Sequence, residues 1–233
     1  QISGTKELLM VHLPSGRERR FSDVVNYSIS ASGNSLLLQL KQKLNGTIYS
    51  ELQYISFQPK SVSKIIWSTK NEKLVVTSHN IDYFGNQVVF SIRNNSNVSK
   101  EVNIWYYQRG MDTAIVKVSN RTHGIPGQFF PSGPVSFTEN GHFILFTLQL
   151  DEDSSLHEPK AVGLEVWSYK DKWLSPAKTS INKKNIKAVI SDKGKVVVPL
   201  EMNGKILYAL KGDFAIVRKP CHEIYGDRFW EKG

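Results

Sequence analysis

Residues 133–148 read Gly-Pro-Val-Ser-Phe-Thr-Glu-Asn-Gly-His-Phe-Ile-Leu-Phe-Thr-Leu and contain two β-patterned runs around a short turn. The first run is 134–137, the second extends over 143–150, and the turn is Glu139-Asn140-Gly141. A tight hairpin between twisted strands usually needs a residue with positive φ, which glycine supplies without steric cost. The segment therefore predicts a β-hairpin centred on Gly141.

Turns of the same kind recur along the chain at Gly33, Gly85, Gly141 and Gly194, each between two β-patterned runs. The spacings are 52, 56 and 53 residues. A repeat period near 50 residues with strand-like content is typical of the blades of a β-propeller. We therefore expect an all-β fold, a β-propeller built from antiparallel blades of about four strands each.

The chain length sets the expected number of blades. Dividing 233 residues by about 53 gives four units and a fraction, which predicts four to five blades in this chain. An unclosed first or last blade exposes an apolar face to water. The chain is therefore expected to form a ring of four or five blades or part of a larger propeller. In either case residues 1–233 form a single propeller domain or a propeller fragment.

The expected strands follow from apolar alternation and turn residues. No stretch of 12 residues has a convincing helical period. The β-patterned runs are 8–12, 17–21, 25–30, 36–40, 52–57, 67–77, 81–93, 102–107, 114–118, 134–137, 143–150, 164–169, a run from 173, 188–190, 196–200, 205–210 and 213–217. The run at 188–190 is expected to open a further unit. Residues 119–132 are expected to connect blades, and 151–160 to form an acidic loop that interrupts a blade.

Charge and cysteine content exclude several kinds of function. The net charge of +9 and the pI near 9.5 would suit an anionic partner. The lysines do not alternate with aromatic residues as they do in proteins that bind single strands, so we expect a solvated surface and no nucleic-acid partner. The densest lysines are Lys178, Lys183, Lys184, Lys187, Lys193 and Lys195. The single cysteine, Cys221, excludes an internal disulfide, and the apolar runs are too short to span a membrane.

One local cluster contains possible metal ligands and a possible nucleophile: Cys221, His222, Glu223 and Asp227. A zinc site needs three or four ligands, commonly at helical or Cys-x-x-Cys spacing. A Cys–His dyad needs partners that the fold places around it. Neither spacing is present, so a structural or loop role is expected for this cluster.

The remaining candidate residues are an acidic stretch, scattered histidines and repeated tryptophans. Carboxylates at alternate positions bind Ca²⁺, but the acidic stretch lacks the glycine and the terminal glutamate of an EF-hand loop. The histidines are isolated and expected at surface or packed positions, and the recurrence of tryptophan indicates packing between blades. These residues are Asp151, Glu152, Asp153 and Glu158; His12, His79, His123, His142 and His157; and Trp67, Trp105, Trp167, Trp173 and Trp230. We therefore assign no catalytic, cofactor-binding or metal-binding residue and expect no cofactor.

Three segments resemble the Phe-Ser-x-Asp-Gly-x-x-Leu-x-Phe blade opening of TolB-like propellers and of the propellers of the prolyl oligopeptidase and dipeptidyl peptidase group. They are residues 133–148, 27–38 and 190–198. Residues 158–174, which contain Val-Trp-Ser-Tyr-Lys-Asp, resemble more specifically the propeller half of bacterial two-domain proteins. In those proteins a prolyl-oligopeptidase-like α/β-hydrolase domain follows the propeller.

The resemblance implies a non-catalytic domain. In the family, the propeller covers the hydrolase active site and restricts access to it. The hydrolase domain supplies the nucleophile on a Gly-x-Ser-x-Gly elbow, and this motif is absent from the chain. Dipeptidyl members carry paired glutamates that hold the substrate's amino terminus, and the chain has no Glu-Glu pair. The expected partner is a C-terminal α/β-hydrolase domain outside this chain, or another protein, with a peptide as substrate.

Two other functions stay open. A stand-alone TolB-like propeller of the cell envelope would bind a protein or another ligand through its loops. An all-β enzyme would need carboxylates or histidines on its inner strands, which here are largely apolar or hydroxylic. The family resemblance implies a periplasmic or cell-envelope location, with the cytoplasm as the other option.

Overall fold

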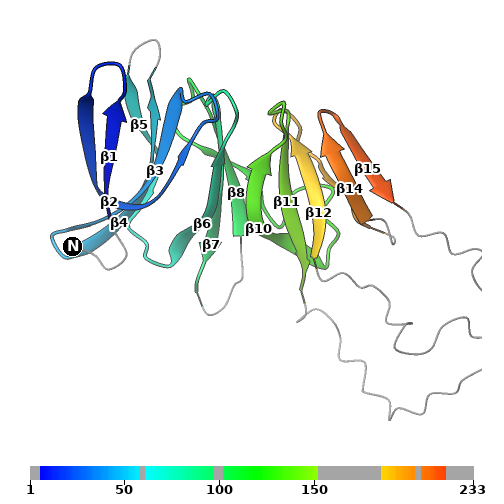
Figure 1. Ribbon diagram of the computed structural model, residues 1–233. Helices are drawn as coiled ribbons and strands as arrows, with labels where there is room; N and C mark the ends of the chain where they lie inside the picture. Colours follow the sequence, from blue (N-terminus) through cyan, green and yellow to red (C-terminus); the bar gives the residue numbers. More distant parts are fainter. Residues whose placement is uncertain (1–5, 58–60, 97–101, 152–184, 203–205, 219–233) are drawn as a thin grey trace, which may run out of the picture.

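A computed structural model describes residues 6–57, 61–96, 102–151, 185–202 and 206–218. These residues form strands and turns in four antiparallel sheets, which lie side by side in a row (Figure 1). The all-β prediction and the expected units of about four antiparallel strands are confirmed. In this part of the chain there is no helix long and apolar enough to cross a membrane.

The first sheet has the strand order β1-β2-β3-β4-β5. Its strands are β1 (Lys6–His12), β2 (Arg17–Ile29), β3 (Ser35–Leu44), β4 (Thr47–Ser56) and β5 (Val62–Thr69). The sequence predicted two strands, 17–21 and 25–30, where the structure has the single strand β2. Asp23 has a φ of 58°, and the pairing of β2 with β3 shifts register between Val24 and Asn26. This bulge bends the strand without ending it, so β2 pairs first with β1 and then with β3.

The hairpin between β3 and β4 turns at Asn45-Gly46, whose φ values are 50° and 81°. Both residues are left-handed, as the two-residue turn of a twisted hairpin requires. Leu44 pairs directly with Thr47 across this turn. The strands predicted at 36–40 and 52–57 are therefore parts of longer strands that reach the Asn-Gly turn.

The second sheet contains β6 (Leu74–Ile81), β7 (Gln87–Asn94), β8 (Val102–Gln108) and β9 (Ile115–Val118). The β-patterned run predicted at 67–77 belongs to two strands, because β5 ends at Thr69 and β6 begins at Leu74 in a different sheet. The break is a turn at Asn71, whose Oδ1 accepts the N–H of Lys73 at 3.0 Å and whose carbonyl accepts the N–H of Leu74 at 3.0 Å. Residues 68–73 read Ser-Thr-Lys-Asn-Glu-Lys, and this polar run is the sign of the turn in the sequence.

The third sheet contains β10 (Phe129–Phe137), β11 (Phe143–Leu150), β12 (Asn185–Ser191) and β13 (Val197–Pro199), and a separate hairpin contains β14 (Ile206–Lys211) and β15 (Phe214–Arg218). The prediction that 188–190 opens a new unit is wrong. Strand β12 pairs along β11, from Phe143↔Ser191 to Gln149↔Asn185, and is the third strand of this sheet. The connection predicted at 119–132 is also shorter, because β10 begins at Phe129.

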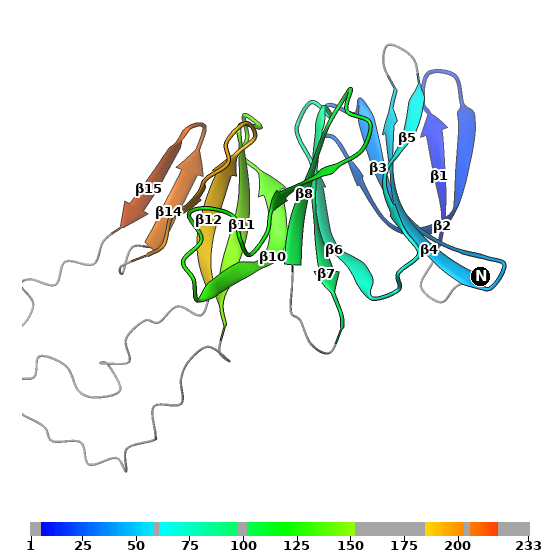
Figure 2. The ribbon, with the colours of Figure 1, turned by 180° about the vertical axis from the view of Figure 1, so that it is seen from behind.

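The first sheet and the β14–β15 hairpin lie at opposite ends of the row (Figures 1 and 2), so the described residues do not close a ring. The strands predicted at 164–169 and from 173 lie outside the described residues, as does the acidic loop beyond Asp151. The single-domain organisation stays a prediction.

Hydrophobic side chains fill the spaces between neighbouring sheets. One buried cluster joins the first sheet to the second, and includes Leu37, Leu52 and Ile66 from the first and Val88 and Phe90 from the second. A second cluster joins the second sheet to the third in the same way. Face-to-face packing of this kind is how propeller blades bury apolar surface, at about 25 cal/mol for each Å² removed from water.

Two of the five tryptophans belong to the core between the first two sheets. Trp67 contacts the ring of Phe90 edge-on, with ring centroids 6.2 Å apart. Trp105 stacks on the same ring at 6.1 Å. The packing role predicted for Trp67 and Trp105 is confirmed, and the other three tryptophans lie outside the described residues.

Candidate functional site

A six-residue turn is repeated in the first three sheets. The glycine N–H donates to the carbonyl of the first turn residue at 2.8, 3.1 and 2.9 Å, in chain order. The N–H of the sixth residue donates to the side-chain oxygen of the first at 3.1, 2.7 and 3.1 Å. The first residues are Ser30, Asp82 and Thr138, the glycines are Gly33, Gly85 and Gly141, and the sixth residues are Ser35, Gln87 and Phe143. All three glycines have φ between 71° and 78°.

Gly194 does not belong to this set, although its spacing predicted that it would. Its N–H donates to the carbonyl of Ser191 at 3.1 Å, as in the other turns. Its φ lies outside the left-handed region, and it joins β12 to β13 inside the third sheet. The even spacing of four glycines therefore combines three equivalent turns with one of a different kind.

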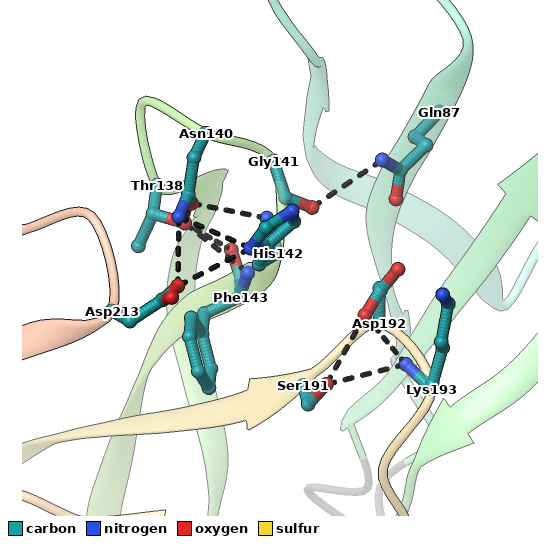
Figure 3. Close-up of polar contacts among 10 residues, drawn as sticks. All are labelled: Gln87, Thr138, Asn140, Gly141, His142, Phe143, Ser191, Asp192, Lys193 and Asp213. Carbon is teal, nitrogen blue, oxygen red and sulfur yellow. Dashed lines mark hydrogen bonds and ion pairs between the residues drawn. The ribbon is translucent and has the colours of Figure 1, made fainter.

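Side chains from the preceding sheet hold these glycine turns in place. The Tyr54 hydroxyl donates to the carbonyl of Gly85 at 2.5 Å. The Gln87 amide donates to the carbonyl of Gly141 at 3.3 Å, as Figure 3 shows. The carbonyls of Gly85 and Gly141 thus each link one sheet to the next.

The Gly194 turn is linked to the second sheet by an ammonium group. Lys117 Nζ donates to the carbonyls of Gly194 at 2.8 Å and Asp192 at 2.5 Å and lies over the ring of Tyr106, 5.7 Å from its centroid. Burial lowers the pKa of Lys117. The Tyr106 hydroxyl donates to Gln87 Oε1 at 2.8 Å, and burial, reinforced by the charges of Asp192 and Asp82, raises the pKa of Tyr106 to about 12. Tyr106 therefore stays a hydrogen-bond donor far above neutral pH.

A polar cluster joins the third turn to the β14–β15 hairpin (Figure 3). Asp213 Oδ1 accepts hydrogen bonds from Asn140 Nδ2 at 2.8 Å and from His142 Nδ1 at 3.2 Å. These two bonds, first from His142 and then from Asn140, lower the pKa of Asp213. The Thr138 hydroxyl donates to Asn140 Oδ1 at 2.7 Å. His142 and Asp213 are exposed, and these hydrogen bonds connect the third sheet to the β14–β15 hairpin.

Ser28 and His79 are in hydrogen-bond contact, as in a catalytic Ser–His dyad, but the third group that such a dyad needs is missing among the described residues. Ser28 Oγ lies 2.9 Å from His79 Nδ1, between strands β2 and β6. A catalytic histidine needs a third group that orients its other nitrogen. His79 Nε2 is buried and has no hydrogen-bond partner among the described residues. Burial also lowers the pKa of His79.

The other candidates from the sequence are dispersed. His12 is exposed, with Nδ1 2.6 Å from Ser15 Oγ, and the carbonyl of His123 accepts the N–H of Val197 at 2.9 Å. Within the described ranges, no three His, Cys, Asp or Glu side chains are close enough to hold a metal ion. The candidates outside those ranges are Glu152, Asp153, His157, Glu158, Cys221, His222, Glu223 and Asp227.

An open groove lies between the ends of the second and third sheets, away from the glycine turns. We call it the Arg93–Gln149 groove. It has a volume of about 580 Å³, and its wall includes Arg93, Asn94, Ser132, Gln149 and Asp151. Smaller hollows of about 340 and 280 Å³ continue it along β10.

The sequence analysis missed this groove. Its polar residues come from β7, the loop after it, β10 and β11, and Arg93 and Gln149 are 56 residues apart in the chain. The polar run Arg93-Asn94-Asn95-Ser96 after a buried strand was a local sign of a polar strand end. Gln149 had no such sign.

No protein-family model matches the chain, and no curated protein matches it. Structural matches include a variant of the AtxE2 isopeptidase with a bound astexin-3 peptide (9% identity, TM-score 0.46, 74% of this chain and 28% of that one). They also include the β-propeller domain of the trilobed protease from Pyrococcus furiosus (11% identity, TM-score 0.39, 89% of this chain and 67% of that one). A third match is a prolyl endopeptidase studied for inter-domain dynamics in catalysis and specificity (13% identity, TM-score 0.42, 84% of this chain and 26% of that one).

This chain therefore spans about a quarter of the length of the matched isopeptidase and prolyl endopeptidase chains. At identities of 9–13% the similarity concerns the fold and not the activity. The matches are to propeller domains of prolyl endopeptidase and related peptidases, the group whose blade opening residues 133–148 resemble.

Proposed function

We propose that this chain is the non-catalytic β-propeller of a prolyl-oligopeptidase-like serine hydrolase. The observation that carries the proposal is the segment 133–148, which resembles the family's blade opening in sequence. It folds as one of three equivalent turns closed by Thr138 and Gly141. The absence of a Gly-x-Ser-x-Gly elbow supports a non-catalytic role for these residues.

In this proposal the propeller restricts access to a hydrolase active site and docks the substrate or a partner protein. Hydrogen bonds from Tyr54 and Gln87 link neighbouring blades, which supports a fixed arrangement of the blades around such an opening. Long or folded polypeptides are then excluded from the catalytic serine. The location proposed for the protein is the periplasm or cell envelope.

The coding sequence downstream of Gly233 tests the association. The proposal expects an α/β-hydrolase domain with a Gly-x-Ser-x-Gly elbow in the same reading frame. A stop codon with no neighbouring hydrolase gene would contradict it.

Cleavage of a peptide series of increasing length by the full-length protein tests whether the propeller restricts access to the active site. The rate should fall steeply with length, and equal rates for short peptides and unfolded proteins would refute gating.

A second candidate function is a stand-alone propeller that binds a protein or ligand. The Arg93–Gln149 groove favours it, because polar donors and apolar walls converge there without any catalytic pair. Capture experiments from cell-envelope extract, with wild type and with Arg93→Gln, would test this role. A partner that both proteins retain equally would argue against the groove as its site.

A further inference from the structure

We propose that the Arg93–Gln149 groove binds the carboxylate of a peptide. This binding site is formed by residues of this chain alone. The proposal therefore does not depend on whether a hydrolase domain accompanies the chain. It rests on the hydrogen-bonding groups of three groove residues, on the charges around them and on the apolar wall beside them.

The two amide side chains of the groove already use their oxygen atoms. Asn94 Oδ1 accepts the N–H of Ser96 at 3.1 Å. Gln149 Oε1 accepts the hydroxyl of Ser132 at 3.0 Å, and Ser132 itself is buried. With their oxygens engaged, Asn94 and Gln149 present N–H donors to a ligand. The groove therefore suits a ligand rich in acceptors.

Arg93 adds a positive charge to these donors. It is exposed, and within the described part of the chain it forms no ion pair. The planar guanidinium matches the two oxygens of a carboxylate in a bidentate arrangement. Asp151 lines the same groove and carries the opposite charge.

The remaining wall of the groove is apolar. Val102, Phe130 and Leu150 line it beside the polar groups. An amino-acid residue offers both features at once, since its carboxylate needs donors and its side chain needs apolar contact. A free inorganic anion would leave this wall unused.

An NMR titration of the full chain tests the proposal through the side-chain N–H signals of Arg93 and Gln149. The probes are N-acetyl-dialanine with a free carboxylate, the same peptide with a C-terminal amide, and inorganic phosphate. The carboxylate peptide should produce saturable shifts of both signals. The amide should bind at least about tenfold more weakly, since a charge-assisted hydrogen bond is lost.

Two variants and one control locate the site. Arg93→Gln should weaken binding of the carboxylate peptide at least about tenfold. Gln149→Glu keeps an acceptor for the Ser132 hydroxyl but replaces the donor with a negative charge, and should weaken binding as much or more. Arg121→Gln removes an equal charge from an exposed residue outside the groove wall and should leave binding unchanged.

Four results would overturn the proposal. The first is equal binding of the carboxylate and amide peptides, and the second is binding of phosphate in preference to the carboxylate. The third is the absence of saturable shifts, and the fourth is peptide binding that survives both Arg93→Gln and Gln149→Glu.

Discussion

At the scale of single residues, Gly85 occupies a more demanding position than Gly33, although both belong to the repeated turn. Their φ values are 78° and 71°, so alanine is strained by about 1 kcal/mol at either position. A Cβ at Gly85 would lie 2.6 Å from Ser35 Oγ and 2.7 Å from Ser35 Cβ, whereas at Gly33 it would meet nothing within 4 Å. Ser35 is buried and has no room to move.

We therefore expect Gly85→Ala to lower the free energy of unfolding by about 1–3 kcal/mol more than Gly33→Ala does. Urea unfolding of the two variants measures this difference. Equal losses would show that the contact between the first two blades at Ser35 is not as tight as described.

His79 makes the stability of the fold depend on pH. Its pKa is lowered in the folded state by burial, while in the unfolded chain it is about 6.5. Below that pH the unfolded state binds more protons than the folded state, so the free energy of unfolding falls as the pH decreases. Above about pH 6.5 both states are neutral at this residue and the penalty vanishes.

The variant His79→Asn keeps a polar group near Ser28 and removes the titration. It should lose less stability than the wild type between about pH 8 and about pH 5.5, whatever its stability at pH 8. His12→Asn, which removes an exposed histidine, is the matched control for the loss of an imidazole. An unchanged slope in His79→Asn would mean that other groups cause the acid sensitivity.

At the scale of elements, the hydroxyl of Tyr54 ties β4 of the first sheet to the turn before β7 in the second. It contacts Ser35 Oγ at 3.1 Å and donates to the carbonyl of Gly85. Tyr54→Phe leaves both groups buried with one partner fewer and should destabilise the fold by about 1–3 kcal/mol.

Tyr49 lies on the same strand and supplies the control. Its ring contacts the ammonium of Lys70, and that contact survives the loss of its hydroxyl. Tyr49→Phe should change the unfolding free energy by less than about 0.5 kcal/mol. Equal effects of the two variants in thermal or urea unfolding would refute a linking role for Tyr54.

Local signals in the sequence were sufficient to predict most of the hairpins. Gly141 and its flanking runs predicted β10, the turn and β11, because a left-handed turn residue and alternation act over a few residues. The boundary at Asn71 was missed although the polar run at residues 68–73 marks it, because the apolar residues before and after that run were read as one pattern. The role of Gly194 was misjudged because the pairing of β12 with β11 is a long-range contact, which spacing alone does not reveal.

The functional features were less predictable for the same reason. Arg93 and Gln149 line one groove only because the second and third sheets pack side by side. Asp213 and His142 are 71 residues apart in the chain and meet only because the β14–β15 hairpin lies beside the third sheet. Neither pair forms a motif in the sequence.

At the scale of the whole molecule, the central claim is that residues 1–233 form the non-catalytic part of a serine hydrolase. Treatment of the full-length natural protein with a fluorophosphonate, followed by mass spectrometry of its peptides, tests this claim most directly. The label should appear on one serine, in a Gly-x-Ser-x-Gly sequence outside these 233 residues. A label on a serine within them, or no labelled serine at all, would contradict the claim.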